Sequence, residues 1–228
     1  MSQLLNALAR IKATGFVPKG ILDIGAYRGE WTKAAAVTFE KSEILMVEAQ
    51  EELGDTLGRF HQLDPKRFQY KIALLGASAA AEVPFYVTKS KWGSSGSSAY
   101  REISEVPATL RHIPRLTLDE LIEEANFPIF EFLKLDVQGA EIDVIAGGIQ
   151  ALKKVEFVMM ELSVLPYNEG APLSGEVIAF MYELGFEPFD MFDQRRDAVG
   201  NLVQLDVTFI RRGSDHCPTV QFEENLKG

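Results

Sequence analysis

The stretch FLKLDVQGAEIDVIAGG, residues 132–148, decides how the fold of this chain is read. A short, mostly apolar run ends at Asp136, and Gln138, Gly139 and Glu141 follow where a buried strand should turn into a helix. A carboxylate is seldom buried without a partner, because removing its charge from water costs several kcal/mol. Asp136 is therefore expected either at the exposed mouth of a sheet or within a paired network.

Apolar runs alternate with helical patterns on both sides of this stretch. We predict strands at 20–26, 43–50, 68–75, 82–89, 130–137, 155–163, 188–192 and 202–212. We predict helices at 29–39, 51–62, 116–127, 140–154 and 175–186. This alternation is typical of an α/β fold with a doubly wound, Rossmann-like and mostly parallel sheet, here ending in an antiparallel β-hairpin.

The size and charge of the chain narrow the class of protein. With 228 residues, one core is expected, so we predict a single domain over 1–228. Within it we expect an N-terminal helix (1–16), a Rossmann-like core (17–212) and a C-terminal tail (213–228). The net charge of −10 argues against nucleic acid or an anionic membrane as a partner. No run approaches the roughly 20 apolar residues of a membrane span, which predicts a soluble, cytoplasmic protein. A homo-oligomer stays open.

The residues that most often bind transition metals are scarce. Cys217 is the only cysteine, and His61, His112 and His216 are far apart in the sequence. This spacing predicts neither an intrachain disulfide nor a zinc site. A magnesium-assisted reaction with Asp136 as a ligand stays open as an alternative.

Acidic residues stand at the ends of four predicted strands: Asp23, Glu48, Asp136 and Glu161. In a doubly wound sheet, ligands bind beyond the carboxyl ends of the strands, near the switch in strand order. Four acids at this edge are more than solvated loops alone would explain. The sequence therefore predicts a ligand site there.

The loop after the first strand indicates the kind of ligand. It reads D-x-G-x-x-x-G from Asp23 to Gly29, not the G-x-G-x-x-G of a nicotinamide or flavin binder. Gly25 and Gly29 still allow a tight turn before a helix, while the Asp23 carboxylate suits a ligand with an ammonium group. Glu48 follows 25 positions later (48 − 23), where an acid can bind both hydroxyls of a ribose. Together these residues favour a nucleoside cofactor with an amino-acid end.

Two motifs resemble a known family. ILDIGAYRGEWT (21–32) is similar to the first motif of class I S-adenosylmethionine-dependent methyltransferases. FLKLDVQGAEIDVIAGG closely resembles the signature of the FkbM family within that class. The likeness covers about 16–212 and continues at Ala73-Leu74, Gly96-Ser97-Ser98, Leu116-Thr117-Leu118-Asp119 and Asp206-Val207-Thr208-Phe209-Ile210. Two departures are visible: Glu48-Ala49 replaces the Glu-Pro of many members, and no acid follows the third strand.

The resemblance implies S-adenosyl-L-methionine as cofactor and assigns its contacts. The methionine part would be surrounded by residues of the first loop: Asp23, Gly25, Ala26, Tyr27 and Gly29. Glu48 would bind the ribose hydroxyls, with Ala49 and Gln50 beside the adenosine and Ala73 and Leu74 flanking the adenine. Asp136 would lie next to the sulfonium, with Val137 and Gln138 lining the mouth of the site.

The resemblance also implies the reaction: O-methylation of a hydroxyl on a sugar or small secondary metabolite, with a small molecule or glycan as acceptor. An alcohol nucleophile needs a base, and the candidates are Asp136 and Glu161. Gln138 is a candidate orienting group. Glu141 reads equally well as an acid that compensates a helix dipole, and His112 is a base by chemistry alone.

The Gly/Ser-rich loop 92–100 would either close over substrate or serve as a plain connector. Four aromatic residues could stack on a ring, or belong to the core: Trp92, Tyr100, Tyr167 and Phe189. Two other classes of protein remain as alternatives. One is a nucleotide- or nicotinamide-binding enzyme on a related sheet, and the other is a non-catalytic protein that keeps a cofactor pocket.

Overall fold

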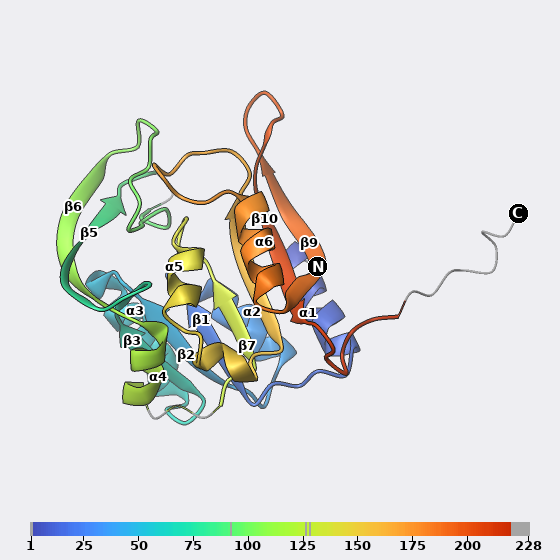
Figure 1. Ribbon diagram of the computed structural model, residues 1–228. Helices are drawn as coiled ribbons and strands as arrows, with labels where there is room; N and C mark the ends of the chain where they lie inside the picture. Colours follow the sequence, from blue (N-terminus) through green and yellow to red (C-terminus); the bar gives the residue numbers. More distant parts are fainter. Residues whose placement is uncertain (1, 92, 126, 128, 220–228) are drawn as a thin grey trace, which may run out of the picture.

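A seven-stranded sheet runs through the computed structural model, which describes residues 2–91, 93–125, 127 and 129–219 (Figure 1). The strand order is β3-β2-β1-β7-β8-β10-β9. The strands are β1 (Gly20–Ile24), β2 (Glu43–Glu48), β3 (Phe68–Ile72), β7 (Phe132–Leu135), β8 (Phe157–Ser163), β9 (Phe186–Arg196) and β10 (Leu202–Arg211). The first five are parallel, and β10 lies antiparallel to both β8 and β9. The predicted doubly wound, mostly parallel sheet with a closing hairpin is confirmed.

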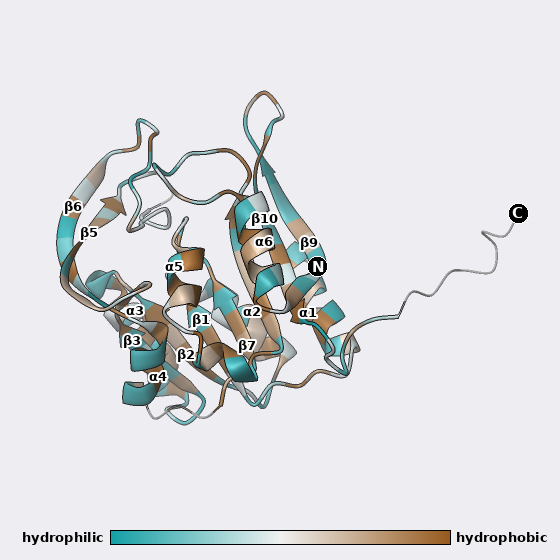
Figure 2. Ribbon diagram, viewed as in Figure 1, coloured by the Kyte–Doolittle hydropathy of each residue, from teal (hydrophilic) through white to brown (hydrophobic). Residues whose placement is uncertain are grey.

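Helices cover both faces of the sheet. Buried residues of α1 (Gln3–Ala13), α2 (Glu30–Thr38) and α3 (Gly54–Leu63) pack into one hydrophobic cluster. Those of α4 (Leu118–Ala125), α5 (Glu141–Ala146) and α6 (Ser174–Glu183) pack into another. The short 3₁₀ helices are η1 (Glu51–Leu53) and η2 (Ala151–Lys154). In Figure 2 most of α4 is coloured as hydrophilic, in keeping with its acidic residues.

The central strands are hydrophobic on both faces because both faces are covered. Ile44 and Met46 of β2 belong to the cluster with α1, α2 and α3, whereas Leu45 and Val47 belong to the cluster with α4, α5 and α6. Successive side chains of a strand point to opposite faces, so a strand between two helix layers needs a continuous apolar run.

A second, three-stranded sheet differs from the prediction. Its order is β4-β6-β5, with β4 (Leu74–Leu75), β5 (Ala80–Thr88) and β6 (Ala108–Leu116). The segment predicted as one strand over 68–75 therefore divides between the two sheets. The strand expected at 82–89, at an edge, lies in this second sheet beside β6 (Figure 1). The sequence analysis missed β6 because its residues ATLRHIPRL mix polar and apolar side chains and are mostly exposed, so they lack the pattern of a buried strand.

The helix predicted over 140–154 is interrupted after α5. A Cβ atom on Gly147 would lie 2.2 Å from the Gly76 carbonyl oxygen, and one on Gly148 would lie 2.5 Å from Leu118 Cδ2. Close approach of the neighbouring backbone and of α4 requires both glycines, and the chain resumes as η2. The short α5 keeps the loop after β7 close to the end of the sheet.

No helix in the described part of the chain combines the length and the apolar character needed to cross a membrane.

Candidate active site

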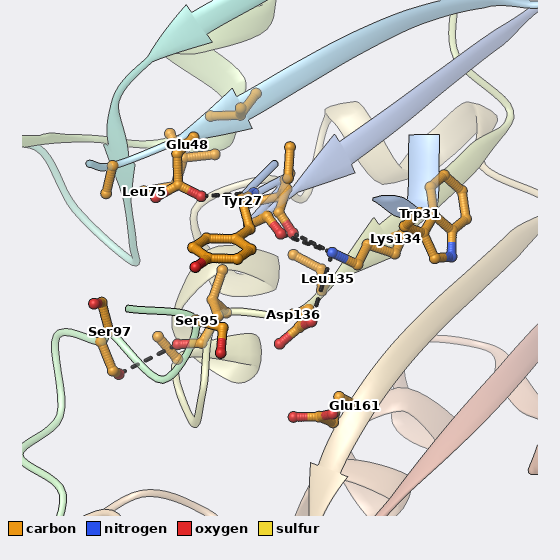
Figure 3. Close-up of a pocket in the computed structure, with 18 of the residues that line it drawn as sticks. Tyr27, Trp31, Glu48, Leu75, Ser95, Ser97, Lys134, Leu135, Asp136 and Glu161 are labelled. Atoms are coloured by element: carbon orange, nitrogen blue, oxygen red, sulfur yellow. Dashed lines mark hydrogen bonds and ion pairs between the residues drawn. The ribbon is translucent and has the colours of Figure 1, made fainter. Parts of the chain in front are cut away.

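A cavity of about 260 Å³ opens at the carboxyl ends of the central strands (Figure 3). Ten of the residues predicted to bind a cofactor line it: Gly25, Ala26, Tyr27, Glu48, Ala49, Gln50, Ala73, Leu74, Asp136 and Val137. The predicted base Glu161 lines it as well, together with side chains of β9 and β10. The strand ends thus bring residues from four separate sequence stretches to one space.

Glu48 is held in place by backbone N–H groups. One carboxylate oxygen accepts a hydrogen bond from the Tyr27 amide at 2.8 Å, and the other accepts one from the Gln50 amide at 2.9 Å. Burial raises the pKa of Glu48, while these N–H donors oppose the rise. Tyr27 adopts a left-handed backbone with φ of 48°, which is uncommon for a residue other than glycine. The carboxylate is therefore fixed before any ligand arrives.

The two glycines of the first loop serve different purposes. Gly25 has φ of 73°, and a Cβ atom there would lie 1.9 Å from the Asp136 carbonyl oxygen. Gly29 has φ of 78°, and its Cβ atom would lie 2.6 Å from the Phe60 ring. Gly25 thus lets the loops after β1 and β7 touch, and Gly29 lets α2 pack beside α3.

Asp23 lies behind the cavity wall. The residue is fully buried; Thr32 Oγ1 donates to one of its carboxylate oxygens at 2.6 Å, and Lys134 Nζ lies 3.1 Å from the other. The sequence analysis expected this carboxylate to meet the ammonium group of a ligand. In the structure a lysine of the chain itself already supplies the ammonium group. Asp23 therefore pairs with Lys134, and Lys134 in turn lies beside Asp136 at the cavity.

Lys134 was missed by the sequence analysis, although it connects the two loops (Figure 3). Its ammonium group donates to the Gly25 carbonyl oxygen at 2.8 Å and lies 3.8 Å from Asp136 Oδ2. Burial lowers the pKa of Lys134, but the neighbouring Asp23 and Asp136 carboxylates outweigh burial and raise the pKa above its ordinary value. A signal existed, because a lysine inside an apolar strand needs an acid on a neighbouring strand, and Asp23 and Lys134 are direct partners in the β1–β7 register.

Gln138 joins the two predicted bases. Its side-chain nitrogen donates to Asp136 Oδ1 at 2.7 Å and to Glu161 Oε1 at 2.6 Å. The Glu161 oxygen also accepts a hydrogen bond from Gln204 Nε2 at 2.7 Å, and its second oxygen lies 3.2 Å from Arg195 Nη1. One Glu161 oxygen is thus bonded by two side-chain amides, and the other faces a guanidinium group.

Burial and the nearby charge of Asp136 raise the pKa of Glu161 to about 7. A base whose pKa lies near neutrality can both hold and release a proton under ordinary conditions. Asp136 is the more open of the two acids, with a side chain that is 35% exposed against 7% for Glu161. The geometry favours Glu161 as the group that could take a proton.

Asp206 adds a further acid to this end of the cavity. It lies directly opposite Glu161 in the β10–β8 register and lines the cavity. Burial and the charge of Glu161 raise its pKa to about 8. Arg195 of β9 is the basic residue beside this group, and it also lies 4.0 Å from Asp193. The sequence analysis did not assign Asp206 or Arg195 to the site because only the tertiary arrangement of the hairpin brings them beside β8.

Glu141 holds the loop after β7 in place by accepting hydrogen bonds from its backbone. One of its oxygens accepts hydrogen bonds from the Val137 and Gly139 amides, both at 3.2 Å. Burial raises the pKa of this carboxyl to about 7. The residue is 2% exposed, so the structure favours its structural interpretation over a catalytic one. His112 lies in β6, opposite Pro84, in the second sheet.

The loop 93–100 lies against the cavity from the side of the second sheet. Ser98 Oγ donates to the carbonyl oxygens of Val137 and Gln138 at 3.2 and 2.8 Å, and Gln50 Nε2 donates to the Ser94 carbonyl at 3.3 Å. The loop is therefore bonded to both sides of the cavity. Trp92 lies outside the described residues.

The other candidate aromatic residues have different surroundings. Tyr100 donates its hydroxyl to Asp143 at 2.8 Å, and burial together with this acid raises its pKa to about 12. Tyr167 lies beside Gln138 and Gln204, and Phe189 packs against the core of the sheet. Tyr167 is thus the one of the three that borders the Glu161 cluster.

The methyltransferase FkbM domain matches residues 23–188, which is more than half of the chain, and the chain belongs to this family. Over 53 residues the chain is 43% identical to the 2-O-methyltransferase NoeI of Sinorhizobium fredii (strain NBRC 101917 / NGR234). That match covers 23% of this chain and 22% of the relative, so the chain matches less than a quarter of the length of this relative.

Two solved structures share the fold. One is the 1,6-didemethyltoxoflavin-N1-methyltransferase of Burkholderia thailandensis with bound S-adenosylhomocysteine, at a TM-score of 0.50 and 14% identity, covering 91% of this chain and 77% of that one. The other is the magnesium protoporphyrin IX methyltransferase of Synechocystis PCC 6803 with bound S-adenosylmethionine, at a TM-score of 0.51 and 6% identity, with the same coverage of 91% and 77%. At these identities the likeness concerns the fold alone.

Family membership identifies S-adenosylmethionine as the cofactor, and the residues of the cavity fit it. Glu48 offers two fixed carboxylate oxygens, the acceptors that a ribose diol requires. Ala73, Leu74, Leu75 and Phe85 give one part of the wall the apolar surface that suits a purine. Asp136, with a side chain that is 35% exposed, offers a negative charge that complements a sulfonium group.

Proposed function

We propose that this chain is an S-adenosylmethionine-dependent O-methyltransferase that acts on a hydroxyl group of a sugar or small metabolite. The observation that carries the proposal is the Glu161 carboxylate. It lies in the same cavity as Glu48 but on β8, with β1 and β7 between the two strands. Gln138, Gln204 and Arg195 direct donors at it. One end of the cavity suits a nucleoside, and the other carries a base.

At the cofactor end, the proposed contacts follow the loops after β1, β2 and β7. Glu48 would accept hydrogen bonds from both ribose hydroxyls: Oε2 has the Tyr27 amide as its donor, and at Oε1 the longer 3.3 Å bond from Gln50 Nε2 would give way to a hydroxyl group. Ala49 and Gln50 would lie beside the adenosine, and Ala73 and Leu74 against the adenine. Gly25, Ala26 and Tyr27 would border the methionine part, with Asp136 and Val137 toward the sulfur.

Asp23 and Gly29 would contribute without direct contact, since the first is sealed behind Lys134 and the second packs against Phe60. Gln138 would contribute through the carboxylates that it bonds. When bound, S-adenosylmethionine supplies a methyl group carried on a cationic sulfur, and the sulfur is left as a neutral thioether once the methyl group has been transferred.

At the acceptor end, Glu161 would take the proton of the acceptor hydroxyl. A carboxylate whose pKa is about 7 is a stronger base than an ordinary glutamate and is still largely ionised above neutral pH. Arg195 and Gln204 would hold the carboxylate in position while the proton arrives. General-base help of this kind contributes roughly 10²–10⁴-fold to a rate.

Two observations support a hydroxyl-rich acceptor. The side chains around Glu161 are two amides, a tyrosine, an arginine and a second carboxyl group, which together offer both donors and acceptors to hydroxyl groups. The relative that shares 43% identity over 53 residues is named a 2-O-methyltransferase. A sugar or a small polyhydroxylated metabolite fits both.

Calorimetric titration of the purified protein with S-adenosylmethionine, S-adenosylhomocysteine and NAD tests the proposal. We expect both sulfur nucleosides to bind and Glu48→Ala to weaken binding at least about 100-fold, because two charge-assisted hydrogen bonds are lost. Glu51→Ala removes an exposed acid three positions along the chain and is the matched control.

The three outcomes separate the three classes of protein. Binding of NAD alone would identify a nicotinamide enzyme on a related fold. Binding of the sulfur nucleosides without methylation of any hydroxylated acceptor in a broad screen would indicate a cofactor-binding protein that lacks turnover. Binding followed by transfer to a hydroxyl group, lost in Glu161→Gln, supports the proposal in full.

A further inference from the structure

Charged and amide groups follow one another in a row beside the cavity. Asp23 is paired with Lys134, Lys134 lies 3.8 Å from Asp136, and Gln138 bonds Asp136 to Glu161. Arg195 then closes the row beyond Glu161. The row runs from Asp23 in β1 to Arg195 in the hairpin strand β9. Within it, Gln138 is the neutral member that stands between two acids.

The backbone of Gln138 is strained and is held from two sides. Its φ is 56°, in the left-handed region that residues other than glycine rarely adopt. Its carbonyl oxygen accepts hydrogen bonds from Ser98 Oγ at 2.8 Å and from Asn168 Nδ2 at 2.6 Å. Strain of this kind persists where the surrounding structure enforces it, and it concentrates at functional sites. Here it turns the side chain toward the two acids.

The side-chain amide has donors for two acids at once. A carboxamide nitrogen carries two hydrogens, and those of Gln138 are directed at Asp136 Oδ1 and Glu161 Oε1 at 2.7 and 2.6 Å. Two carboxylates beside each other repel, and a donor placed between them offsets that repulsion and fixes their separation. The Gln138 oxygen faces the Tyr167 hydroxyl at 3.4 Å, which sets the orientation of the amide.

We propose that Gln138 is a positioning residue whose amide joins Asp136 and Glu161 into one hydrogen-bonded carboxylate pair and thereby aims Glu161 at the acceptor hydroxyl. This proposal rests on the proposed function for its role in methyl transfer. The carboxylate pair itself exists without any ligand and can be tested alone. Gln138 does not take the proton. It fixes the position of the Glu161 carboxylate and the strength of its electrostatic coupling to Asp136.

The charged groups that face Glu161 come from several elements. Asp136 and Lys134 come from β7 and the loop after it, Arg195 and Asp193 from β9, and Asp206 from β10. Burial and the Asp136 charge raise the pKa of Glu161, whereas Arg195, the Gln138 hydrogen bond and Lys134 lower it. Removing the amide therefore shifts the titration of Glu161 in a direction that can be measured.

The test is a carboxyl titration of the ligand-free protein by ¹³C NMR, with the Glu161 signal assigned by its loss in Glu161→Gln. Asp136→Asn removes the neighbouring charge and should lower the apparent pKa of Glu161 in the wild-type background. The same substitution is then made in Gln138→Leu, which keeps the bulk of the side chain without donors. Gln204→Leu is the matched control, because Gln204 bonds the same Glu161 oxygen but not Asp136.

We expect Asp136→Asn to shift the Glu161 pKa in the Gln204→Leu background by as much as in the wild-type background. In the Gln138→Leu background the shift should be less than half as large. Without the amide the two carboxylates move apart, so each senses the other less. Gln138→Asn is the second variant, since asparagine tolerates the left-handed backbone but is too short to reach both acids. Gln138→Asn should behave like Gln138→Leu and covers the case in which the leucine variant fails to fold.

An equal effect of Asp136→Asn in all backgrounds would overturn the proposal, because the two acids would then be coupled by proximity alone. This readout needs neither cofactor nor acceptor. If the protein binds no sulfur nucleoside while the titrations behave as expected, the proposed function fails and the carboxylate pair stands. The reverse pattern would leave the methyltransferase and remove Gln138 as its positioning residue.

Discussion

Glu48 is the last residue of β2, Glu161 lies near the end of β8 in the same sheet, and burial raises the pKa of both carboxyl groups. Their surroundings differ. The carboxylate of Glu48 is bonded by the backbone amides of Tyr27 and Gln50, which belong to the two adjacent loops. The carboxylate of Glu161 is bonded by side chains of Gln138, Gln204 and Arg195, which come from separate parts of the chain.

The difference indicates two kinds of site in one cavity. Backbone donors are set by the loop conformation and survive most substitutions, so the cofactor end can stay constant while other residues change. Side-chain donors change with each substitution, so the acceptor end can be altered one residue at a time. The proton-accepting group and the residues that determine acceptor choice would then lie at the more adaptable end.

The largest expected effect separates the two acids by function. Glu161→Gln keeps the shape of the side chain but removes the base, so we expect methyl transfer to fall by roughly 10²–10⁴-fold. The dissociation constant for S-adenosylhomocysteine should change less than about threefold. Turnover with an identified acceptor and calorimetry on the same preparations give the two numbers. A variant that keeps more than about a tenth of the activity would remove Glu161 as the base.

The next effect concerns the lysine on which both ends depend. Lys134→Met leaves the buried Asp23 carboxylate without its cation, and breaking a buried pair of this kind costs about 3–5 kcal/mol of unfolding free energy. Lys71→Met is the control, because Lys71 pairs with Glu124 at an exposed position and should cost less than about 1 kcal/mol. Urea denaturation of both variants measures the difference, and equal losses would contradict the assignment.

A pH dependence of stability should arise from the acceptor end. The pKa of Glu161 is about 7 in the folded protein against an ordinary value of 4.5, so the folded state binds the proton more tightly. Stability is therefore highest below about pH 4.5 for this group and is lost as the pH rises toward 7. Glu161→Gln should reduce the loss between pH 5 and pH 8 by about 1–3 kcal/mol in urea denaturation. An unchanged loss would show that other groups, such as Asp206 and Glu141, account for it.

The smallest expected effect tests the loop that bonds to both ends. Ser98→Ala removes donors to the Val137 and Gln138 carbonyls and an acceptor for the Tyr100 amide, with an expected cost of about 1 kcal/mol. Ser104→Ala, in an exposed turn, should stay within about 0.5 kcal/mol. Thermal unfolding compares the two. We also expect faster proteolysis within 93–100 in Ser98→Ala, and identical cleavage rates would argue that Ser98 does not secure the loop.

The cofactor end could be predicted from sequence because its residues lie in short, continuous motifs. The order strand, glycine turn and helix places Gly25 and Ala26, and the end of the next strand places Glu48. Parallel strands that are adjacent in the sheet bring these ends together without any long-range detail. These residues line the cavity, and their contacts with a cofactor stay a prediction.

The acceptor end could not be predicted in the same way. Arg195 and Asp206 enter the cavity because β10 inserts between β8 and β9, and the sequence predicts a hairpin but not its neighbour. Strand β6 was not predicted because its mixed polar and apolar residues are those of an exposed segment. The role of Lys134 could be predicted only from its register with Asp23, and that register depends on the pairing of β1 with β7.

The first helix has a practical consequence for anyone who prepares this protein. Leu4 of α1 lines the cavity, and Gln3 exchanges hydrogen bonds with Asp193 of the hairpin at 3.1 and 3.4 Å. The N-terminal end of α1 therefore lies close to the cavity, beside the end at which the acceptor is expected to enter. An affinity tag joined to α1 would start close to the cavity, so activity screens are better begun with the tag cleaved.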